Sequence, residues 1–513
     1  MHLLYPASAE DTSFRKDDMT LHALKALGLP RLLSMEALDI LQLLSADPAV
    51  LTWRQAIFAD MKRIPVLYDI LKKLRTYIAD LRDLSRKRME GGRSTEDVLY
   101  SFGELKVFIE MIGEMTAALE NHWDDLHSEA MRSLFGSLKT IAEDEQFAVM
   151  QTYIDKIMAS MRFPRSMTIG VNLNARFEVY EAGVVSINSE YYVGGGVFTS
   201  LFGKSEDELR CSTPLVSGES SAAFSGAIYS VLNDAAAKAL KKSRSMMLSY
   251  IQNVVSGIYS IYEDLTFLLR AGEYIRETEE KKVRMCTPAF VSPADGVMEI
   301  RRLVNPVLLR KLTIGQITAN DVCFPEGAAI FLITGPNSGG KSVYLRSVGI
   351  AALTAQLGLP VTASEAALPL FAGICCHFPA EDSENDSRLV EECKSMKKIL
   401  DSLPPRTDSA GADQILLLMD ESFSGTVSAE GAIIAEEVLK TIRSRRACCI
   451  YSTHLHELAS RVPALNERTP RIVTLSAEYA SGRRTYRIIP QEPGGRSYAY
   501  EIARTYGLEY TGD

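Results

Sequence analysis

One glycine-rich loop in the sequence has the spacing needed to bind phosphate groups. Residues 335–342 read Gly-Pro-Asn-Ser-Gly-Gly-Lys-Ser, which fits the pattern G-x-x-x-x-G-K-[ST]. Glycines let the backbone approach phosphate oxygens closely with its N–H groups turned inward. Lys341 would reach the β- and γ-phosphates of a nucleoside triphosphate, and the Ser342 hydroxyl would be a ligand of Mg²⁺. The alternative is an ordinary glycine turn, which this spacing makes the rarer case.

The segments on either side of the loop support the phosphate-binding interpretation. The apolar run of residues 329–333 predicts a buried strand before the loop, and residues 343–348 predict a helix after it. A helix that begins at the loop adds its positive N-terminal end to the site. We expect the nucleotide to contact Gly335, Pro336, Asn337, Ser338, Gly339, Gly340, Lys341, Ser342 and Val343.

Two further apolar runs end in polar residues that could complete the site. Residues 415–419 precede Asp420 and Glu421, as expected of a buried parallel strand that ends at the carboxyl edge of its sheet. Asp420 would hold Mg²⁺ through water, and Glu421 would polarise the water that attacks the γ-phosphate. Residues 447–452 form the other run, and His454 just beyond it would sense the γ-phosphate. Taken alone, an acidic pair at a strand end or a capping histidine is common.

The composition is that of an ordinary globular chain. With 513 residues, of which 46% are hydrophobic and 24% charged, it predicts roughly two to four domains and a large core. No apolar stretch has membrane-spanning length and the first residues lack a signal-peptide pattern, so we expect a cytoplasmic protein without membrane contact. The eight cysteines include no C-x-x-C pair, which favours reduced, packed thiols over disulfides or a zinc site.

The net charge of −9 argues against a surface generally coated for nucleic acid, although local basic patches remain compatible with it. Two basic clusters fall on helical segments, at residues 82–88 and 238–244, and either could contact DNA phosphates. A solvated helix face is the more common role of such a cluster.

Hydrophobic periodicity divides the chain into a helical part and a later α/β part. Residues 34–160 follow a helical pattern in which Asp47 caps a helix and Pro48 begins it. Alternation from Met167 onward predicts a small β element over about 165–217, and a long helical pattern returns over residues 218–280.

The second part should begin near residue 287. Residues 404–411, which are rich in proline and polar residues, predict a surface loop before the strand at 415. Residues 471–475 and 484–488 predict a hairpin near the end of the sequence.

The site segments resemble the ATPase domain of the MutS family of DNA mismatch-recognition proteins. Residues 332–346 are similar to that family's ITGPN-x-GGKST-Y-x-R, residues 418–431 to its Asp-Glu pair and GTS-x-x-DG loop, and residues 452–458 to its ATH-x-x-EL. Residues 495–504 resemble the family's final S-Y-G stretch, and Asn320 with Asp321 its segment on the base side of the nucleotide. The clear resemblance spans residues 300–508, and the helical part is compatible with the family's core and lever helices.

The resemblance implies a contact between subunits at residues 387–393. In the family, a serine and an aromatic residue in this segment reach the nucleotide of the other subunit of a dimer. Ser387 and Glu392 fit the pattern, whereas Leu389 replaces the aromatic residue and Arg388 the usual threonine. Ser387 is therefore the expected trans contact.

The chain also departs from the bacterial mismatch sensors. They carry an N-terminal domain with a Phe-x-Glu wedge that stacks on the mispaired base, and we do not expect that domain before the helical part of this sequence. Phe102 and Glu104 match the wedge letters but lie in a helical region, where so short a match arises by chance. The helix-turn-helix and nuclease extensions of some relatives are not expected after residue 508.

We therefore expect a mostly α-helical core and lever region over residues 1–286, with its small β element, and an α/β P-loop NTPase domain of the ABC type over residues 287–513. The expected activity is DNA-modulated ATP hydrolysis with ATP and Mg²⁺. Its catalytic residues would be Lys341, Glu421 and His454, and its metal ligands Ser342 and Asp420.

The resemblance implies a homodimer that switches its grip on mismatched or branched DNA in repair or recombination, with other repair proteins as possible partners. One alternative is a P-loop ATPase scaffold that acts on a protein partner without reading DNA. A transporter ATPase is a weaker one, because the LSGGQ signature is absent before Asp420.

Overall fold

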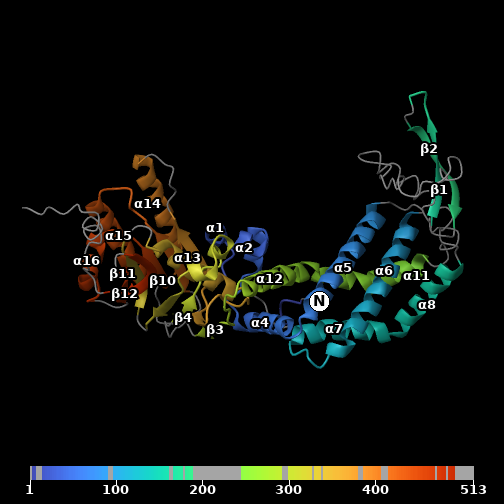
Figure 1. Cartoon of the computed structure of the whole chain (residues 1–513), viewed down its shortest axis with the longest axis horizontal. Coiled ribbons are helices and arrows are strands. Elements are labelled where there is room, and N and C mark those ends of the chain that lie inside the picture. The colour runs from blue at the N-terminus through green and yellow to red at the C-terminus, as the bar shows by residue number, and fades with distance from the viewer. Residues whose placement is uncertain are drawn as a thin grey trace, which may run out of the picture. The chain divides into compact units, whose positions relative to one another are not determined.

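The computed structural model describes residues 3–6, 14–90, 96–160, 166–176, 179–188, 244–291, 298–325, 328–336, 339–378, 385–405, 414–467, 471–480 and 483–491 (Figure 1). The chain forms two compact units. We call the first the helical unit, which comprises Met1, Asp69–Asp124 and Arg132–Leu265, and the second the sheet unit, which comprises His2–Tyr68, Asp125–Met131 and Thr266–Asp513. The boundary expected at residues 286/287 does not coincide with this division, because N-terminal helices pack into the sheet unit.

Within the helical unit, α6 (Glu96–Leu119) packs against α8 (Glu145–Ser160) and α11 (Arg244–Asn253). The Phe108 ring on α6 makes edge contacts with Phe147 at 6.3 Å and Tyr250 at 6.2 Å between ring centroids. The apolar stripe of this helix is buried at Leu105, Phe108, Ile112 and Met115. The helices α5 (Val66–Glu90) and α7 (Glu129–Glu143) complete the predicted run of helices. Among the described residues, no helix combines the length and the apolar character needed to cross a membrane.

The β element expected near residue 165 is confirmed as an antiparallel pair, β1 (Ser166–Leu173) and β2 (Val179–Asn188). The remainder of that prediction, residues 189–217 with the Gly194–Gly196 stretch, lies outside the described residues. The helical pattern expected over residues 218–280 is confirmed from residue 244 onward, and residues 218–243 lie outside the described residues. There α11 is followed by a 3₁₀ segment, η2 (Val255–Ile261), and then by α12 (Tyr262–Glu280).

Four helices near the N-terminus belong to the sheet unit: α1 (Asp18–Leu27), α2 (Leu29–Leu33), α3 (Ala37–Leu43) and α4 (Pro48–Arg63). The predicted cap of α4 is confirmed, since the Asp47 carboxylate accepts the N–H of Ala49 at 2.8 Å. Arg54 falls in the apolar stripe of α4 and is fully buried. Its guanidinium donates to the carbonyl oxygen of Leu4 at 3.2 Å, so this helix fixes the first described residues of the chain.

A six-stranded sheet forms the core of the sheet unit, in the order β12-β11-β6-β10-β9-β8. Neighbouring strands run parallel except for the antiparallel edge pair β11 and β12, which confirms the predicted terminal hairpin. The strands are β6 (Ala328–Thr334), β8 (Gly373–His377), β9 (Ile415–Asp420), β10 (Ala447–Ser452), β11 (Arg471–Ala480) and β12 (Arg483–Pro490). Four buried cysteines lie in this sheet, at Cys375, Cys376, Cys448 and Cys449, and the cysteines of the described residues are free thiols.

Helices cover both faces of the six-stranded sheet (Figure 1). On one face lie α14 (Asn385–Ser402), α15 (Ser428–Arg443) and α16 (His456–Leu465), whose apolar residues share one cluster with alternate strand residues such as Leu332, Leu417 and Tyr451. On the other face α13 (Lys341–Ala355) packs on β9 and β10 and is contacted in turn by α1. Central strands buried on both faces explain the continuous apolar runs of the sequence.

A second sheet of four strands, in the order β3-β7-β4-β5, lies in the same unit. Its strands are β3 (Ala289–Val291), β4 (Met298–Leu303), β5 (Asn320–Phe324) and β7 (Glu365–Pro369). The Phe324 ring of β5 stacks on Phe331 of β6, with centroids 3.4 Å apart. This contact joins the smaller sheet to the strand that leads into the glycine loop.

Candidate functional site

Three neighbouring strands bring the predicted site residues together. In the central part of the large sheet, Ser452 of β10 pairs with Ile333 of β6 on one side and with Asp420 of β9 on the other. Backbone hydrogen bonds continue beyond these pairs, from Thr453 N–H to Ile333 at 2.9 Å and from Glu421 N–H to Ser452 at 2.8 Å. The carboxyl ends of β6, β9 and β10 therefore lie level, at the edge where parallel α/β sheets bind ligands.

The backbone of the glycine loop adopts a conformation that residues with a side chain could not adopt without strain or clashes. Gly335 and Gly340 have φ of +123° and +96°, which L-amino acids rarely adopt. At Gly339 an added Cβ would lie 2.8 Å from the Ala477 side chain and 3.0 Å from the carbonyl oxygen of Pro336. The glycines thus allow a tight loop that packs against β11. Asn337 and Ser338, expected to contact phosphate, lie outside the described residues.

Lys341 is the first residue of α13, and its side chain turns back into the loop. Its ammonium group donates to the carbonyl oxygens of Gly335 at 2.9 Å and Pro336 at 3.1 Å, and the residue is only 3% exposed. Burial lowers the pKa of Lys341 below its ordinary value, although the Glu421 and Asp420 carboxylates oppose this shift. Lys341 occupies the position from which a P-loop lysine can reach phosphate.

Ser342 and Asp420 form the expected oxygen pair. The Ser342 hydroxyl donates to Asp420 Oδ1 at 2.9 Å, and Arg346 Nη2 lies 4.0 Å from Asp420 Oδ2. Burial raises the pKa of Asp420 above its ordinary value, and the bond from Ser342 and the charge of Arg346 work against that rise. A hydroxyl and a carboxylate are the hard oxygen donors that Mg²⁺ prefers, so these two residues fit a magnesium site.

Glu421 and His454 face each other at the ends of β9 and β10. Glu421 Oε1 lies 3.7 Å from His454 Nδ1, and both side chains are more than one third exposed, at 40% and 38%. Among the residues that the structure describes, His454 Nδ1 has no hydrogen-bond partner. A carboxylate and an imidazole that remain accessible can both bind to water or to a ligand in the site.

The structure places Val343 beside the loop, whereas it does not describe the side chain of Ser387. Val343 lies in the first turn of α13 with 37% of its surface exposed, directly after the loop. Ser387 lies in the first turn of α14, where its side chain is not among those described, so the trans contact expected of it stays a prediction.

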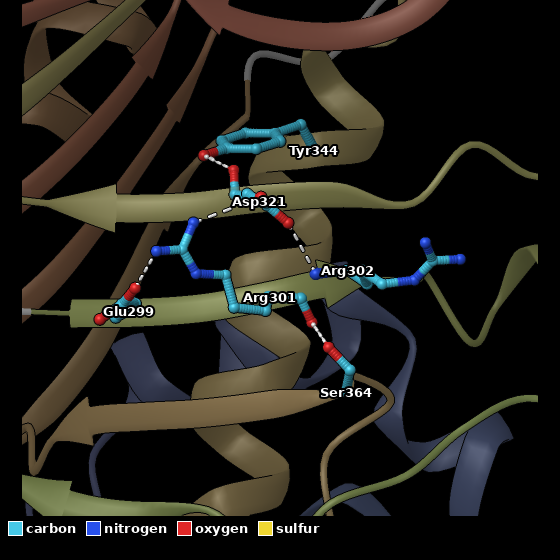
Figure 2. A network of polar contacts seen from close by, with 6 residues as sticks. All are labelled: Glu299, Arg301, Arg302, Asp321, Tyr344 and Ser364. Atoms are coloured by element: carbon cyan, nitrogen blue, oxygen red, sulfur yellow. Dashed lines mark hydrogen bonds and ion pairs between the residues drawn. The ribbon is translucent and has the colours of Figure 1, made fainter.

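The strand β5 fixes the start of α13 through a polar network (Figure 2). The Tyr344 hydroxyl donates to the carbonyl oxygen of Asp321 at 3.2 Å, and the Asp321 carboxylate accepts the N–H of Arg302 at 2.8 Å. The Arg301 guanidinium bridges Asp321, at 3.4 Å, and Glu299. Because Tyr344 follows Lys341 and Ser342 by less than one helical turn, this network also positions those two side chains.

Asn320, singled out by resemblance, and Asn305 both make structural contacts. Asn320 donates to the Tyr486 carbonyl oxygen at 3.1 Å and accepts the N–H of Ile488 at 2.8 Å, which ties β5 to β12. Asn305 donates to the carbonyl oxygen of Val343 at 3.4 Å, on the helix that begins in the loop. Both therefore brace elements next to the site.

Sequence reasoning missed the residues that hold the turn after β9. Glu392 of α14 and His377 of β8 reach this turn, and Tyr451 of β10 donates a hydrogen bond to it. Glu392 carried a signal, since it fits the segment containing Ser387. The other two lie in apolar strands, where the sequence indicates only burial.

In the helical region, the residues that match the wedge letters and the basic cluster at residues 82–88 both interact with other side chains of the protein. Phe102 and Glu104 are buried in α6, where Glu104 pairs with Arg88 at 2.9 Å and accepts a hydrogen bond from Tyr259, so the letters of the wedge are core residues. In the basic cluster at residues 82–88, each cation has a carboxylate partner: Arg82 with Glu263, Arg86 and Lys87 with Asp83, and Arg88 with Glu104. In the other cluster, residues 238–243 lie outside the described residues.

The site combines a strand, a glycine loop and a helix with two neighbouring strands that end in carboxylates and a histidine. This arrangement is typical of α/β domains that bind nucleoside triphosphates. Comparison with known families agrees with this class. Residues 331–509 match the model of MutS domain V, and residues 46–277 match that of the MutS2 N-terminal domain. The chain is thus similar to MutS-family proteins: the match to MutS domain V, their ATPase domain, follows a mostly helical region that matches the MutS2 N-terminal domain.

Individual relatives each match less than half of the chain. It is 30% identical over 228 residues to the DNA mismatch repair protein MutS of Halalkalibacterium halodurans and 33% identical over 223 residues to that of Thermus aquaticus, in each case 43% of this chain and 25% of the relative. It is 35% identical over 209 residues to Endonuclease MutS2 of Streptococcus thermophilus, which is 40% of this chain and 24% of the relative. The matched residues thus span about a quarter of the length of these relatives.

Proposed function

We propose that the chain binds ATP with Mg²⁺ at the ends of β6, β9 and β10 and hydrolyses it. The observation that carries this proposal is the convergence of Lys341, the Ser342–Asp420 pair and the Glu421–His454 pair at one sheet edge. Together they supply a cation for the phosphates, oxygen ligands for a metal, and a carboxylate for the attacking water.

Each residue has a defined task in the proposed reaction. Lys341 leaves the carbonyl oxygens of Gly335 and Pro336 to bind the phosphates, and the loop N–H groups with the N-terminus of α13 hold them in place. Ser342 and Asp420 would hold Mg²⁺, which neutralises charge on the phosphate oxygens when bound.

The remaining two residues would act on the reacting end of the nucleotide. Glu421 orients and polarises the attacking water, and His454 binds an oxygen of the terminal phosphate. Their exposure allows both to reach water and ligand.

We further propose that ATP turnover switches the grip of a homodimer on mismatched or structured DNA. The names of the relatives, a DNA mismatch repair protein and an endonuclease, support a DNA substrate. Ser387, near the start of α14, would reach the nucleotide of the partner subunit.

A second candidate is a P-loop ATPase that acts on a protein partner without reading DNA. The carboxylate partners of the cluster at residues 82–88 favour it, because paired cations have less positive charge to offer to phosphates. Under this proposal the helical unit is an interaction module.

Steady-state ATP hydrolysis and equilibrium ATP binding test the nucleotide site. Lys341→Ala should lose hydrolysis, because it removes the ammonium group that lies against the loop carbonyl oxygens of Gly335 and Pro336 and would bind the phosphates. The matched control is Lys440→Ala on α15, whose ammonium group is exposed and pairs with Glu436 and Glu437. Wild-type hydrolysis by Lys341→Ala would show that the site is assigned wrongly.

Fluorescence anisotropy with duplex, mismatched, single-stranded and four-way DNA at two salt concentrations separates the two candidates. A DNA-binding switch should bind at least one of these, more tightly at low salt, because phosphate contacts release counterions. Failure to bind all four at low salt would favour the protein-partner function.

A further inference from the structure

The turn that follows β9 has an unfavourable backbone at the residue proposed to prepare water. Glu421 has φ +53° and Phe423 has φ +63°, and neither is glycine. Residues with side chains stay in this region only where their surroundings hold them there, and such positions cluster at active sites. The turn of residues 421–423 therefore needs contacts that keep Glu421 in its orientation.

The strongest of these contacts comes from α14. Glu392 Oε2 accepts the backbone N–H of Phe423 at 2.7 Å, and Glu392 is only 5% exposed. A charged acceptor inside the protein makes a stronger hydrogen bond than a neutral one. Glu392 thereby fixes the backbone N–H of Phe423, two residues after Glu421.

Two strand residues hold the middle of the turn. The Tyr451 hydroxyl of β10 donates to the carbonyl oxygen of Ser422 at 2.6 Å, and His377 Nδ1 lies 2.7 Å from the Ser422 hydroxyl. The other ring nitrogen of His377 lies 3.3 Å from the carbonyl oxygen of Glu392. His377 therefore bridges the turn and α14.

The protonation of His377 agrees with this bridge. Burial lowers the pKa of His377, which favours the neutral ring, while the Glu392 backbone and side chain oppose the shift and His22 adds to it. In the neutral ring, Nε2–H donates to the carbonyl oxygen of Glu392 and Nδ1 accepts the hydroxyl hydrogen of Ser422. Both ring nitrogens then have a matching partner.

We propose that Glu392, His377 and Tyr451 are positioning residues that hold the turn of residues 421–423, so that the Glu421 carboxylate faces His454 in the site. This inference rests on the proposed function, because it assigns a role in hydrolysis to residues that do not contact nucleotide. It also makes Glu421 sensitive to the position of α14, the helix that carries Ser387.

The test compares four variants of the full chain by ATP affinity, KM and kcat. Glu392→Ala removes the acceptor, and we expect kcat to fall by about 10- to 100-fold, the order expected for a misplaced catalytic group, with ATP affinity and KM unchanged. Glu392→Gln keeps an oxygen acceptor and should restore most of kcat. Glu391→Ala is the matched control, since that neighbouring carboxylate is exposed and pairs with Lys394. Tyr451→Phe removes the hydrogen bond to Ser422 and should lower kcat without changing affinity, and it serves as the test if Glu392→Ala does not fold.

A general structural role would change affinity and kcat together and would not distinguish the alanine from the glutamine variant at position 392. That outcome overturns the inference, as does a wild-type kcat in Glu392→Ala, or in Tyr451→Phe where the alanine variant does not fold. Glu421→Gln separates this failure from that of the proposed function. If Glu421→Gln is inactive while Glu392→Ala is not impaired, the positioning role alone is wrong, and if Glu421→Gln hydrolyses ATP normally, both are wrong.

Discussion

Gly431 allows α15 to pack directly on the turn after β9, and replacing it by alanine tests that packing. An added Cβ at Gly431 would lie 2.6 Å from the carbonyl oxygen of Phe423, far inside van der Waals contact. This oxygen belongs to the backbone, and the N–H of the same residue is held by Glu392. The turn cannot yield without giving up that bond.

Two effects of Gly431→Ala oppose each other, and their magnitudes decide the outcome. Alanine is favoured over glycine in a helix by at most about 1 kcal/mol. Inserting a methyl group into a filled site costs about 1–3 kcal/mol. A backbone oxygen is the less adaptable kind of neighbour, so we expect the clash to win and the variant to be about 1–2 kcal/mol less stable.

The chain offers a matched control in Gly113→Ala. Gly113 is an exposed glycine in α6, and a Cβ there would meet no atom within 4 Å. Only the helix preference then operates, so Gly113→Ala should be about 0.5–1 kcal/mol more stable than wild type.

Urea unfolding followed by tryptophan fluorescence reads the two units separately. The chain has two tryptophans, Trp53 in the sheet unit and Trp123 in the helical unit, so Trp53→Phe and Trp123→Phe backgrounds each leave one probe. Gly431→Ala should lower the midpoint reported by Trp53, and Gly113→Ala should raise the one reported by Trp123. A Gly431→Ala midpoint equal to or above wild type would refute the reasoning.

Two further predictions concern the loop and the buried histidine. Gly339→Ala should weaken ATP binding by more than about tenfold, measured by titration calorimetry, because its Cβ would displace the loop from Ala477. An unchanged affinity would mean that the loop does not need this close packing. Burial lowers the pKa of His377, so the unfolded chain takes up the proton more readily and stability falls as the pH drops below the ordinary histidine value of about 6.5. In His377→Gln the urea midpoint should therefore fall less steeply as the pH drops through this range. An equally steep fall in the variant would show that His377 does not cause the loss of stability.

The parts of the site that could be predicted from the sequence are those set by local patterns. The apolar runs before the loop, Asp420 and His454 marked strands buried on both faces, and such strands form the centre of a parallel sheet. The spacing of the glycines and Lys341 depends on backbone geometry within one loop. The cap at Asp47 likewise involves only neighbouring residues.

Other features depend on contacts that no local pattern carries. Arg54 occupies a position in an apolar stripe that predicts a hydrophobic side chain, and it is buried because carbonyl oxygens distant in the sequence accept its N–H groups. The helical pattern of residues 244–280 is divided by a 3₁₀ segment although its apolar residues are mostly buried, because burial does not require one continuous α-helix. Glu421, with its positive φ, begins a turn whose next two residues are bound by Tyr451 and Glu392, side chains that reach the turn only in the folded chain.

ATP turnover at this site should change the grip of the protein on DNA. The rate at which the full chain leaves a fluorescent four-way or mismatched DNA, measured by stopped flow with and without Mg-ATP, tests it directly. We predict that ATP changes this dissociation rate in the wild type. Glu421→Gln should bind ATP without hydrolysing it, so with Mg-ATP present it should keep the dissociation rate of the ATP-bound protein. An identical dissociation rate with and without ATP, from DNA that the protein binds, would contradict the account.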